Sequence, residues 1–423
     1  MQKIFYNAKV YTMNDACEEA EAFLINDGSV VFVGSNDEVL KMKQGDTELV
    51  DLKQKCVVPA LFNNGVSLYR IIENKLKSAK KLKFIEKSDD FDENYERFCN
   101  YSIYKSEFLK LQKQLLEMGV TTVKELFLNE KEFTFWKKIS SENLLEVDVI
   151  GYVDYKQAKR VMDDNCRSFR KYKNHFRLGG YSISLDGGLI EKKAWLTKPY
   201  KCEKHYLGYS VYFDEELCFL IKTVLEEKKQ LLVEANGDRA VEQFLRCFEE
   251  TVKTEKVEDV FKPCIISCGA IKMKHFNKMQ ELKITPSFKV VDLKNEKELV
   301  GVLGKNRANK MIPLKNFEEN RSDFLLNGNI DELSEPFEYA KLVSNRKLHK
   351  MFEKPQNINF STTINSLIKV SSENCFDDGQ KGSIECGKLA NFIVLDEVSE
   401  LKNVGNLKTK VKHVYLNGEK IKI

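Results

Sequence analysis

Three carboxylates in the middle of the chain have the surroundings of functional side chains. Glu234 lies at the end of a predicted strand over residues 231–235, and Asp186 and Asp238 each stand next to a glycine. A carboxylate at a strand end can ligate a metal or act as a general base, but it can equally pair with a lysine. Aspartates beside glycine commonly stabilise turns. These three residues are the catalytic candidates, and each also has a structural interpretation.

Serines and cysteines offer nucleophiles, but the sequence around them lacks the partners that they need. Ser67, Ser182 and Ser267 have no nearby histidine in the sequence to accept the hydroxyl proton. Cys264 and Cys268 form the one closely spaced pair, and no second pair lies near them to complete a metal site. The sequence therefore disfavours a serine hydrolase, and it favours buried cysteines over a metal or redox site.

Strands and helices alternate through the middle of the chain, as in an α/β protein. Apolar residues three and four apart predict helices over 108–118 and 217–225. Short apolar runs predict strands over 120–123, 181–185, 231–235, 264–267, 284–288 and 324–326. Strands separated by helices form parallel sheets, and across roughly 300 residues a (β/α)8 TIM barrel is the natural closed arrangement. Periodicity alone leaves a two-domain α/β fold open.

Both ends of the chain are rich in short strands. Asn26-Asp27-Gly28 is a tight-turn signal between apolar runs at 22–25 and 30–34, and further strands are predicted at 392–396 and 411–418. We expect the two ends to meet in one small β-sandwich domain. The predicted domains are 1–58 together with 378–423 for the β-sandwich, and 59–377 for the barrel.

Several segments carry a resemblance to a known family. Asp51–Lys55 leads into Val57–Asn63, and near the other end runs Gly382–Asp396. Together they resemble the segments that bracket the barrel in the amidohydrolase superfamily, in its amidohydrolase 3 branch. Gly180–Gly187 is similar to that branch's Gly-x-Lys-x-x-x-Asp-Gly, and Asn236–Val241 is similar to its Gly-Asp-Arg-Ala. The resemblance implies a TIM barrel with one or two metal ions that activate a water for hydrolysis.

The positions that the resemblance assigns to metal ligands carry other residues in this chain. Where the family has Asp-x-His-x-His after the first strand, this sequence reads Asn-Asn-Gly-Val-Ser over 63–67. The family's lysine, later histidines and eighth-strand aspartate are substituted too. The six positions are Gly65, Ser67, Ser182, Glu234, Ser267 and Gly328. Zinc hydrolase sites normally use at least two imidazoles. None of the five histidines falls on these positions; they are His175, His205, His275, His349 and His413.

The composition of the chain limits the cellular environment and the classes of binding partner that we expect. The net charge of +4 comes from 68 basic and 64 acidic residues, which gives no case for a nucleic-acid partner. No apolar run approaches the ~20 residues of a membrane span, and the first residues lack an apolar signal core. The eleven scattered cysteines fit reduced thiols. We expect a cytoplasmic protein without a membrane partner, and a homo-oligomer stays open.

Three functions follow, from different classes. The first is a metal-free, catalytically degenerate amidohydrolase-like protein, a pseudoenzyme that binds a small molecule or a partner and needs no cofactor. The second is a hydrolase acting on carbon–nitrogen bonds other than peptide bonds, with zinc or another divalent metal. The third is a structural subunit that pairs with an active paralogue. A fold alone does not decide among them.

Overall fold

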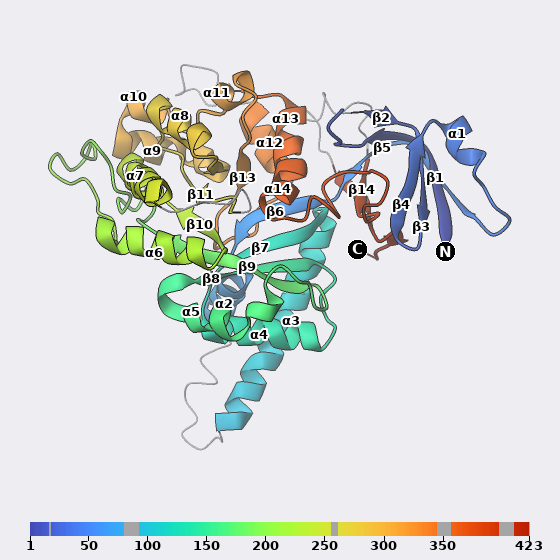
Figure 1. Cartoon of the computed structure of the whole chain (residues 1–423), viewed down its shortest axis with the longest axis horizontal. Coiled ribbons are helices and arrows are strands. Elements are labelled where there is room, and N and C mark those ends of the chain that lie inside the picture. Colours follow the sequence, from blue (N-terminus) through green and yellow to red (C-terminus); the bar gives the residue numbers. More distant parts are fainter. Residues whose placement is uncertain (17, 80–92, 255–260, 345–356, 397–409, 423) are drawn as a thin grey trace.

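The chain forms a barrel and a smaller β domain, each built on an eight-stranded sheet (Figure 1). This computed structural model describes residues 1–16, 18–79, 93–254, 261–344, 357–396 and 410–422, with the backbone alone for 93–100 and 410. The β domain contains both chain ends, and the barrel contains the residues between them.

The barrel sheet is parallel throughout, and its strands follow one another in chain order. Its strands are β6 (Leu61–Val66), β7 (Val120–Leu128), β8 (Asp148–Asp154), β9 (Phe176–Ser184), β10 (Gln230–Glu234), β11 (Cys264–Ile266), β12 (Thr285–Lys289) and β13 (Leu325–Asn327). The six predicted barrel strands are confirmed, and so is the (β/α)8 architecture. No strand was expected over 148–154, where β8 lies.

The first and last barrel strands meet without a backbone ladder. Asn64 Nδ2 on β6 donates to the carbonyl of Leu326 on β13 at 3.1 Å. Just beyond both strands, the amide of Ser67 donates to the carbonyl of Ile330 at 2.7 Å. These contacts bring the two ends of the sheet together and nearly close the barrel.

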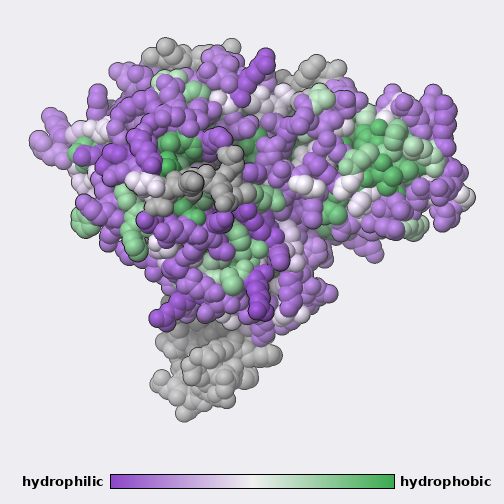
Figure 2. Space-filling view, viewed as in Figure 1, coloured by the Kyte–Doolittle hydropathy of each residue, from purple (hydrophilic) through white to green (hydrophobic). Residues whose placement is uncertain are grey.

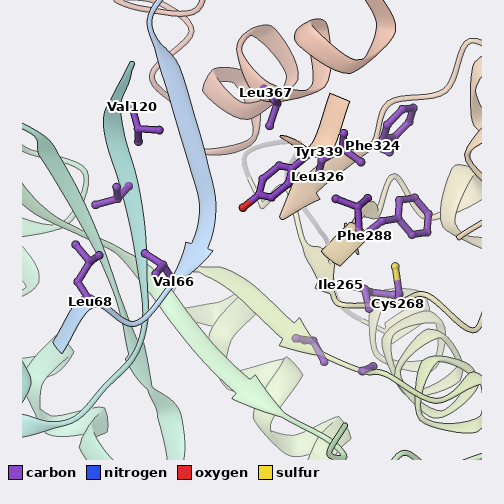
Figure 3. Packing of buried hydrophobic residues seen from close by; sticks show 14 of the residues in the cluster. Val66, Leu68, Val120, Ile265, Cys268, Phe288, Phe324, Leu326, Tyr339 and Leu367 are labelled. Carbon is purple, nitrogen blue, oxygen red and sulfur yellow. The ribbon is translucent and has the colours of Figure 1, made fainter. Parts of the chain in front are cut away.

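Helices surround the barrel sheet and bury their apolar faces against it. They are α2 (Leu68–Ser78), α3 (Glu93–Glu117), α4 (Glu130–Ser141), α5 (Tyr155–Asp164), α6 (Asp214–Glu226), α7 (Asp238–Thr254), α8 (Met273–Glu281), α9 (Glu296–Leu303), α10 (Lys305–Ala308), α11 (Leu314–Glu319), α12 (Pro336–Ser344), α13 (Phe360–Leu367) and α14 (Lys369–Asn374), with short 3-10 turns η2 (Cys166–Ser168) and η3 (Val290–Asn295). In α7, residues Val241, Phe244 and Phe248 are buried at helical spacing, which is why this segment forms an amphipathic helix. Figure 3 shows another part of the same cluster, with Val66, Val120, Ile265, Phe288 and Leu326 labelled on β6, β7, β11, β12 and β13.

The β domain joins both ends of the chain in one sheet. Its elements are β1 (Gln2–Tyr11), β2 (Glu19–Ala20), β3 (Ala22–Asn26), β4 (Ser29–Gly34), α1 (Asn36–Leu40), β5 (Glu48–Pro59), β14 (Phe392–Asp396), β15 (Lys410–Leu416) and β16 (Glu419–Lys420). The C-terminal β14 pairs antiparallel with the N-terminal β5. The prediction that the two ends share one β domain is therefore confirmed. β5 ends at Pro59 and β6 begins at Leu61, so the chain passes from one sheet to the other at Ala60.

The sheet of the β domain curls over itself. β14 and β3 are three places apart in the strand order, which would separate them by roughly 14 Å in a flat sheet. Yet the ring centroids of Phe23 and Phe392 are 5.0 Å apart, and those of Phe5 and Phe392 are also 5.0 Å apart. The aromatic rings of the two halves thus pack edge to face across the inside of the curl, as in a sandwich, although the strands belong to one hydrogen-bonded sheet.

The amino end of the barrel is closed by α14 and the segment after it. Arg177 Nη2 donates to Asp377 Oδ1 at 3.0 Å, and Tyr172 donates its hydroxyl to Asp377 Oδ2 at 2.8 Å. Lys381 Nζ donates to Asp148 Oδ2 at 2.6 Å and to Asp377 Oδ2 at 3.1 Å. Buried charges persist when they are paired in this way. This polar network closes the amino end of the barrel.

The surface is mainly hydrophilic on the face shown in Figure 2, with a compact apolar area over the β domain. Among the described helices, none combines the length and the apolar composition that a bilayer crossing needs.

Candidate functional site

The carboxyl ends of the barrel strands form the rim where barrel enzymes place their active sites. Because all eight strands are parallel, residues at these ends lie on the same rim. The six positions assigned to family ligands lie at or near it, on five different strands. Gly65 and Ser67 lie at the end of β6, Ser182 lies in β9, Glu234 ends β10, Ser267 follows β11 and Gly328 follows β13.

Position 65 lies against the end of a neighbouring side chain. A Cβ atom on Gly65 would lie 2.9 Å from Cδ1 of Leu126, closer than carbon atoms pack. Leu126 comes from the neighbouring strand β7 and is fully buried. It belongs to an apolar cluster in the barrel interior that includes Phe62, Ile150, Ile266 and Leu325. A side chain at the first ligand position would therefore meet Leu126 on one side and, 4.0 Å from its Cβ atom, the amide nitrogen of Asn327.

Ser67 and Ser182 use their hydroxyls within the fold. Ser67 is the N-cap of α2, and its Oγ accepts from the amide of Arg70. Ser182 Oγ accepts from the amide of Phe127 at 2.9 Å and donates to the carbonyl of Tyr152 at 3.1 Å. Both serines are fully buried, so each hydroxyl serves a backbone group that would otherwise lack a partner.

Ser267 and Asn327 carry buried polar atoms that, unlike the hydroxyls of Ser67 and Ser182, have no hydrogen-bond partner in the part of the chain that the structure describes. These atoms are Ser267 Oγ and both amide atoms of Asn327. Ser267 also has a φ of 64°, an unusual conformation for a residue with a side chain.

Position 328 is as crowded as position 65. A Cβ atom on Gly328 would lie 2.3 Å from the Tyr339 hydroxyl oxygen and 2.9 Å from Ser334 Oγ. Figure 3 shows Tyr339 beside Leu326, with its hydroxyl on the side of β6. A larger side chain at position 328 would have to displace this buried tyrosine.

Glu234 is the one residue among the six with a carboxylate. Its Oε2 accepts from the Ser184 hydroxyl at 2.8 Å, and its Oε1 accepts from Asn236 Nδ2 at 3.4 Å. Burial raises the pKa of Glu234, although these hydrogen bonds and the charge of Lys289 oppose that rise. Glu234 is thus a half-buried carboxyl group at the rim that is held by neutral hydrogen-bond donors.

Asp186 and Asp238 hold loops together. The Asp186 carboxylate accepts from the backbone amides of Trp195, Asn236 and Gly237 at 2.8–2.9 Å. Asp238 accepts from the amide of Thr197 at 2.8 Å and lies 2.6 Å from Lys272 Nζ. Burial raises the pKa of Asp238, but its bonds to Lys272 and Thr197 outweigh burial and hold it below the ordinary value. Both aspartates therefore make the loop contacts that their structural interpretation predicted.

The described histidines do not gather at the rim. His175 lies at the amino end of the barrel, with Nδ1 2.9 Å from Asp148 Oδ1. The others lie in the loop before α6, in α8 and in β15; they are His205, His275 and His413. His349 falls outside the described residues. Within the described ranges, no three His, Cys, Asp or Glu side chains come close enough together to hold a metal ion.

Two residues that shape the rim were not singled out in the sequence, Glu125 and Leu126. Glu125 is fully buried and accepts from the amides of Leu68 and Tyr69 at 2.8 and 3.1 Å. A carboxyl group at the first turn of α2 satisfies amides that have no partner within the helix. No motif marks these two positions, because they lie inside an ordinary strand pattern.

Comparison with known proteins identifies the family. A family model described as the amidohydrolase family matches residues 104–421. The chain therefore belongs to the amidohydrolase family, as its sequence motifs indicated. The match begins after Gly65 and Ser67, so it does not include the first pair of ligand positions.

Solved structures share the fold at low sequence identity. An uncharacterised metal-dependent hydrolase from Pyrococcus horikoshii is 20% identical, with a TM-score of 0.79 over 96% of this chain and 99% of that one. Another from Pyrococcus furiosus is 18% identical, with a TM-score of 0.78 over 94% of this chain and 100% of that one. A curated relative, the exoenzymes regulatory protein AepA of Pectobacterium carotovorum subsp. carotovorum, is 38% identical over 61 residues. That match spans 14% of this chain and 13% of AepA.

Proposed function

We propose that this chain is a pseudoenzyme of the amidohydrolase family, a binding protein on a hydrolase fold that performs no metal-dependent hydrolysis. The observation that carries the proposal is the contact between positions 65 and 126. A Cβ atom on Gly65 would overlap Cδ1 at the end of the Leu126 side chain, so a ligand side chain at position 65 requires Leu126 to move. The polar groups beside this position are the carboxylate of Glu234, the hydroxyl of Ser267 and the amide of Asn327, of which only Glu234 is a strong ligand for zinc.

The donor set at the rim does not fit the metal that the fold implies. A catalytic zinc takes three protein ligands and leaves one position for water. Glu234 offers one carboxylate, and the hydroxyls of Ser67 and Ser182 are already used by backbone groups. Hydroxyl groups are also poor ligands beside imidazole or carboxylate. No step of a reaction is therefore assigned to a metal.

Metal content and turnover together test this proposal. The full chain, purified without chelators, should contain well below one zinc, manganese or iron per molecule. About one metal per chain, lost in Glu234→Ala but kept in Glu338→Ala, would refute it. Glu338 is a suitable control because it is a half-exposed carboxylate on α12. Chelator-sensitive hydrolysis of N-acyl amino acids, cyclic amides or formamides would instead support the hydrolase.

Restoring the first clamp alone should not restore hydrolysis. The variant Gly65→His with Ser67→His would supply two imidazoles, but Glu234 would then be needed both as the third ligand and as the base that orients a water. A positioned general base contributes about 10²–10⁴-fold in rate. Turnover by this double variant above that of the unmodified chain would show that the lost function depends on these two positions alone.

A further inference from the structure

A surface groove lies between α5 and α6, on the side of the barrel where these helices are seen in Figure 1. It has a volume of about 670 Å³. Its apolar lining comes from Tyr155, Tyr212, Phe219 and Leu220, and its charged lining from Lys156, Lys159, Glu215 and Glu216. Because α5 begins directly after β8, the groove lies at the same rim as the family ligand positions.

Large apolar side chains stand exposed beside this groove. Phe219 on α6 is 70% exposed and forms part of the groove wall. The segment leading into α6 exposes Phe213 by 77%, Tyr209 by 57% and Val211 by 50%. Single exposed apolar residues are normal, but four within eleven residues next to an apolar groove mark an interaction surface.

The charges on the two sides of the groove are opposite. Lys156 lies on α5, and Glu215 lies on α6. Neither side chain forms a salt bridge with another residue in the described part of the chain, and Lys156 instead lies 5.2 Å above the Tyr212 ring. The lysine on one side of the groove can therefore pair with the glutamate on the opposite side of the groove in a second molecule, and the reverse.

We propose that this groove is the interface of a two-fold symmetric homodimer. In such a dimer the same patch serves both chains, so residue i of one contacts residue j of the other and the reverse. The Phe219 of each chain enters the Tyr155–Tyr212 groove of its partner. The α5 of one chain then faces the α6 of the other, which sets Lys156 against the partner's Glu215 twice. A surface with both a protruding ring and a groove, and with both charges, fits a second copy of itself.

A charge-exchange experiment tests this pairing in the full chain. Lys156→Glu and Glu215→Lys should each convert the dimer to monomer, because each places two pairs of like charges across the interface. An equimolar mixture of the two variants should form a heterodimer, because both contacts become attractive again. Native mass spectrometry distinguishes the species by the mass of each variant.

Replacing an apolar residue of the groove tests the dimer interface independently of the charges. Phe219→Asp should raise the dissociation constant about tenfold or more, because buried aromatic residues dominate interfaces. Met42→Asp is the matched control, since Met42 is 40% exposed on the β domain and should leave the dimer unchanged. A monomeric unmodified chain, a dimer insensitive to Phe219→Asp, or a mixture that stays monomeric would each overturn the proposal. The metal content tested above is independent of these outcomes.

Discussion

Lys381 Nζ lies 2.6 Å from Asp148 Oδ2, which joins the segment after α14 to the start of β8 across the amino end of the barrel. Both side chains are largely buried, and Lys381 also lies 3.1 Å from Asp377. The chain thus concentrates its buried ionic contacts at the end of the barrel away from the candidate site.

Replacing Lys381 by methionine should destabilise the fold strongly. Lys381→Met would leave Asp148 and Asp377 buried without their common cation, and breaking a buried pair from one side costs about 3–5 kcal/mol. Urea unfolding followed by circular dichroism would measure the loss. Lys412→Met is the control, because its pair with Asp396 is exposed and should be worth about 0–1 kcal/mol. Equal effects from both variants would contradict a structural role for the network.

A side chain at position 65 should be tolerated only when Leu126 is shortened. Gly65→His should cost about 1–3 kcal/mol through overpacking against Leu126. Leu126→Ala alone should cost about 2–5 kcal/mol because it leaves a cavity. The double variant should be more stable than the sum of the two losses predicts, and a double-mutant cycle would give the coupling. Gly45→His is the control, because a Cβ there meets no atom within 4 Å. Strict additivity would mean that the two positions do not compete for space.

Stability should fall as the pH drops from 6.5 towards 4 because of His275. Burial lowers the pKa of this α8 histidine to about 4 from its ordinary 6.5, with Lys274 adding to the shift and Glu242 opposing it. Between these values the unfolded chain binds a proton that the folded chain does not, so folding loses up to about 3 kcal/mol. Above pH 6.5 the contribution is fully present. Denaturant unfolding at pH 7 and pH 4.5 should show a smaller difference in His275→Gln.

The contribution of His175 to stability should change with pH in the opposite direction to that of His275. Its hydrogen bond to Asp148 outweighs burial and raises the pKa of His175 above 6.5. The folded chain then holds this proton more tightly, so its contribution is present below pH 6.5 and is lost as the pH rises through the raised value. His175→Gln should therefore lose stability at pH 6 but little at pH 9, by less than about 1 kcal/mol because the side chain is half exposed. If the pH dependence of the unfolding free energy changed in the same direction in His175→Gln and His275→Gln, the opposite pKa shifts assigned to the two histidines would be wrong.

Asp186 should matter for stability through its backbone contacts. Asp186→Ala would remove the acceptor of the Trp195, Asn236 and Gly237 amides, which should cost on the order of 3 kcal/mol. Thermal and urea unfolding would measure this loss. Asp164→Ala is the control, since Asp164 is an exposed residue at the end of α5. A variant of unchanged stability would reopen a functional role for Asp186.

Most of the fold followed from local patterns in the sequence. The turn at Asn26-Asp27-Gly28 and the apolar runs at both ends predicted strands that the structure contains as β3, β4, β14 and β15. Six barrel strands were predicted in the same way, because a buried strand needs a short apolar run between turns or helices. β8 was missed. Its residues, Asp148–Asp154, form a short run interrupted by Gly151, and the helix before it, α4, was not predicted either. β6 (Leu61–Val66) was also not among the six predicted strands.

The sequence by itself determined the family and the identity of the residues at six ligand positions, because motifs and residue types are local properties. What surrounds those positions was decided by the tertiary structure. Leu126 reaches Gly65 because β6 and β7 are neighbours in the barrel, and Tyr339 reaches Gly328 because α12 packs beside β13. Lys381 meets Asp148 across 233 residues of sequence. Such contacts depend on strand order and on the closure of the barrel, which no local period encodes.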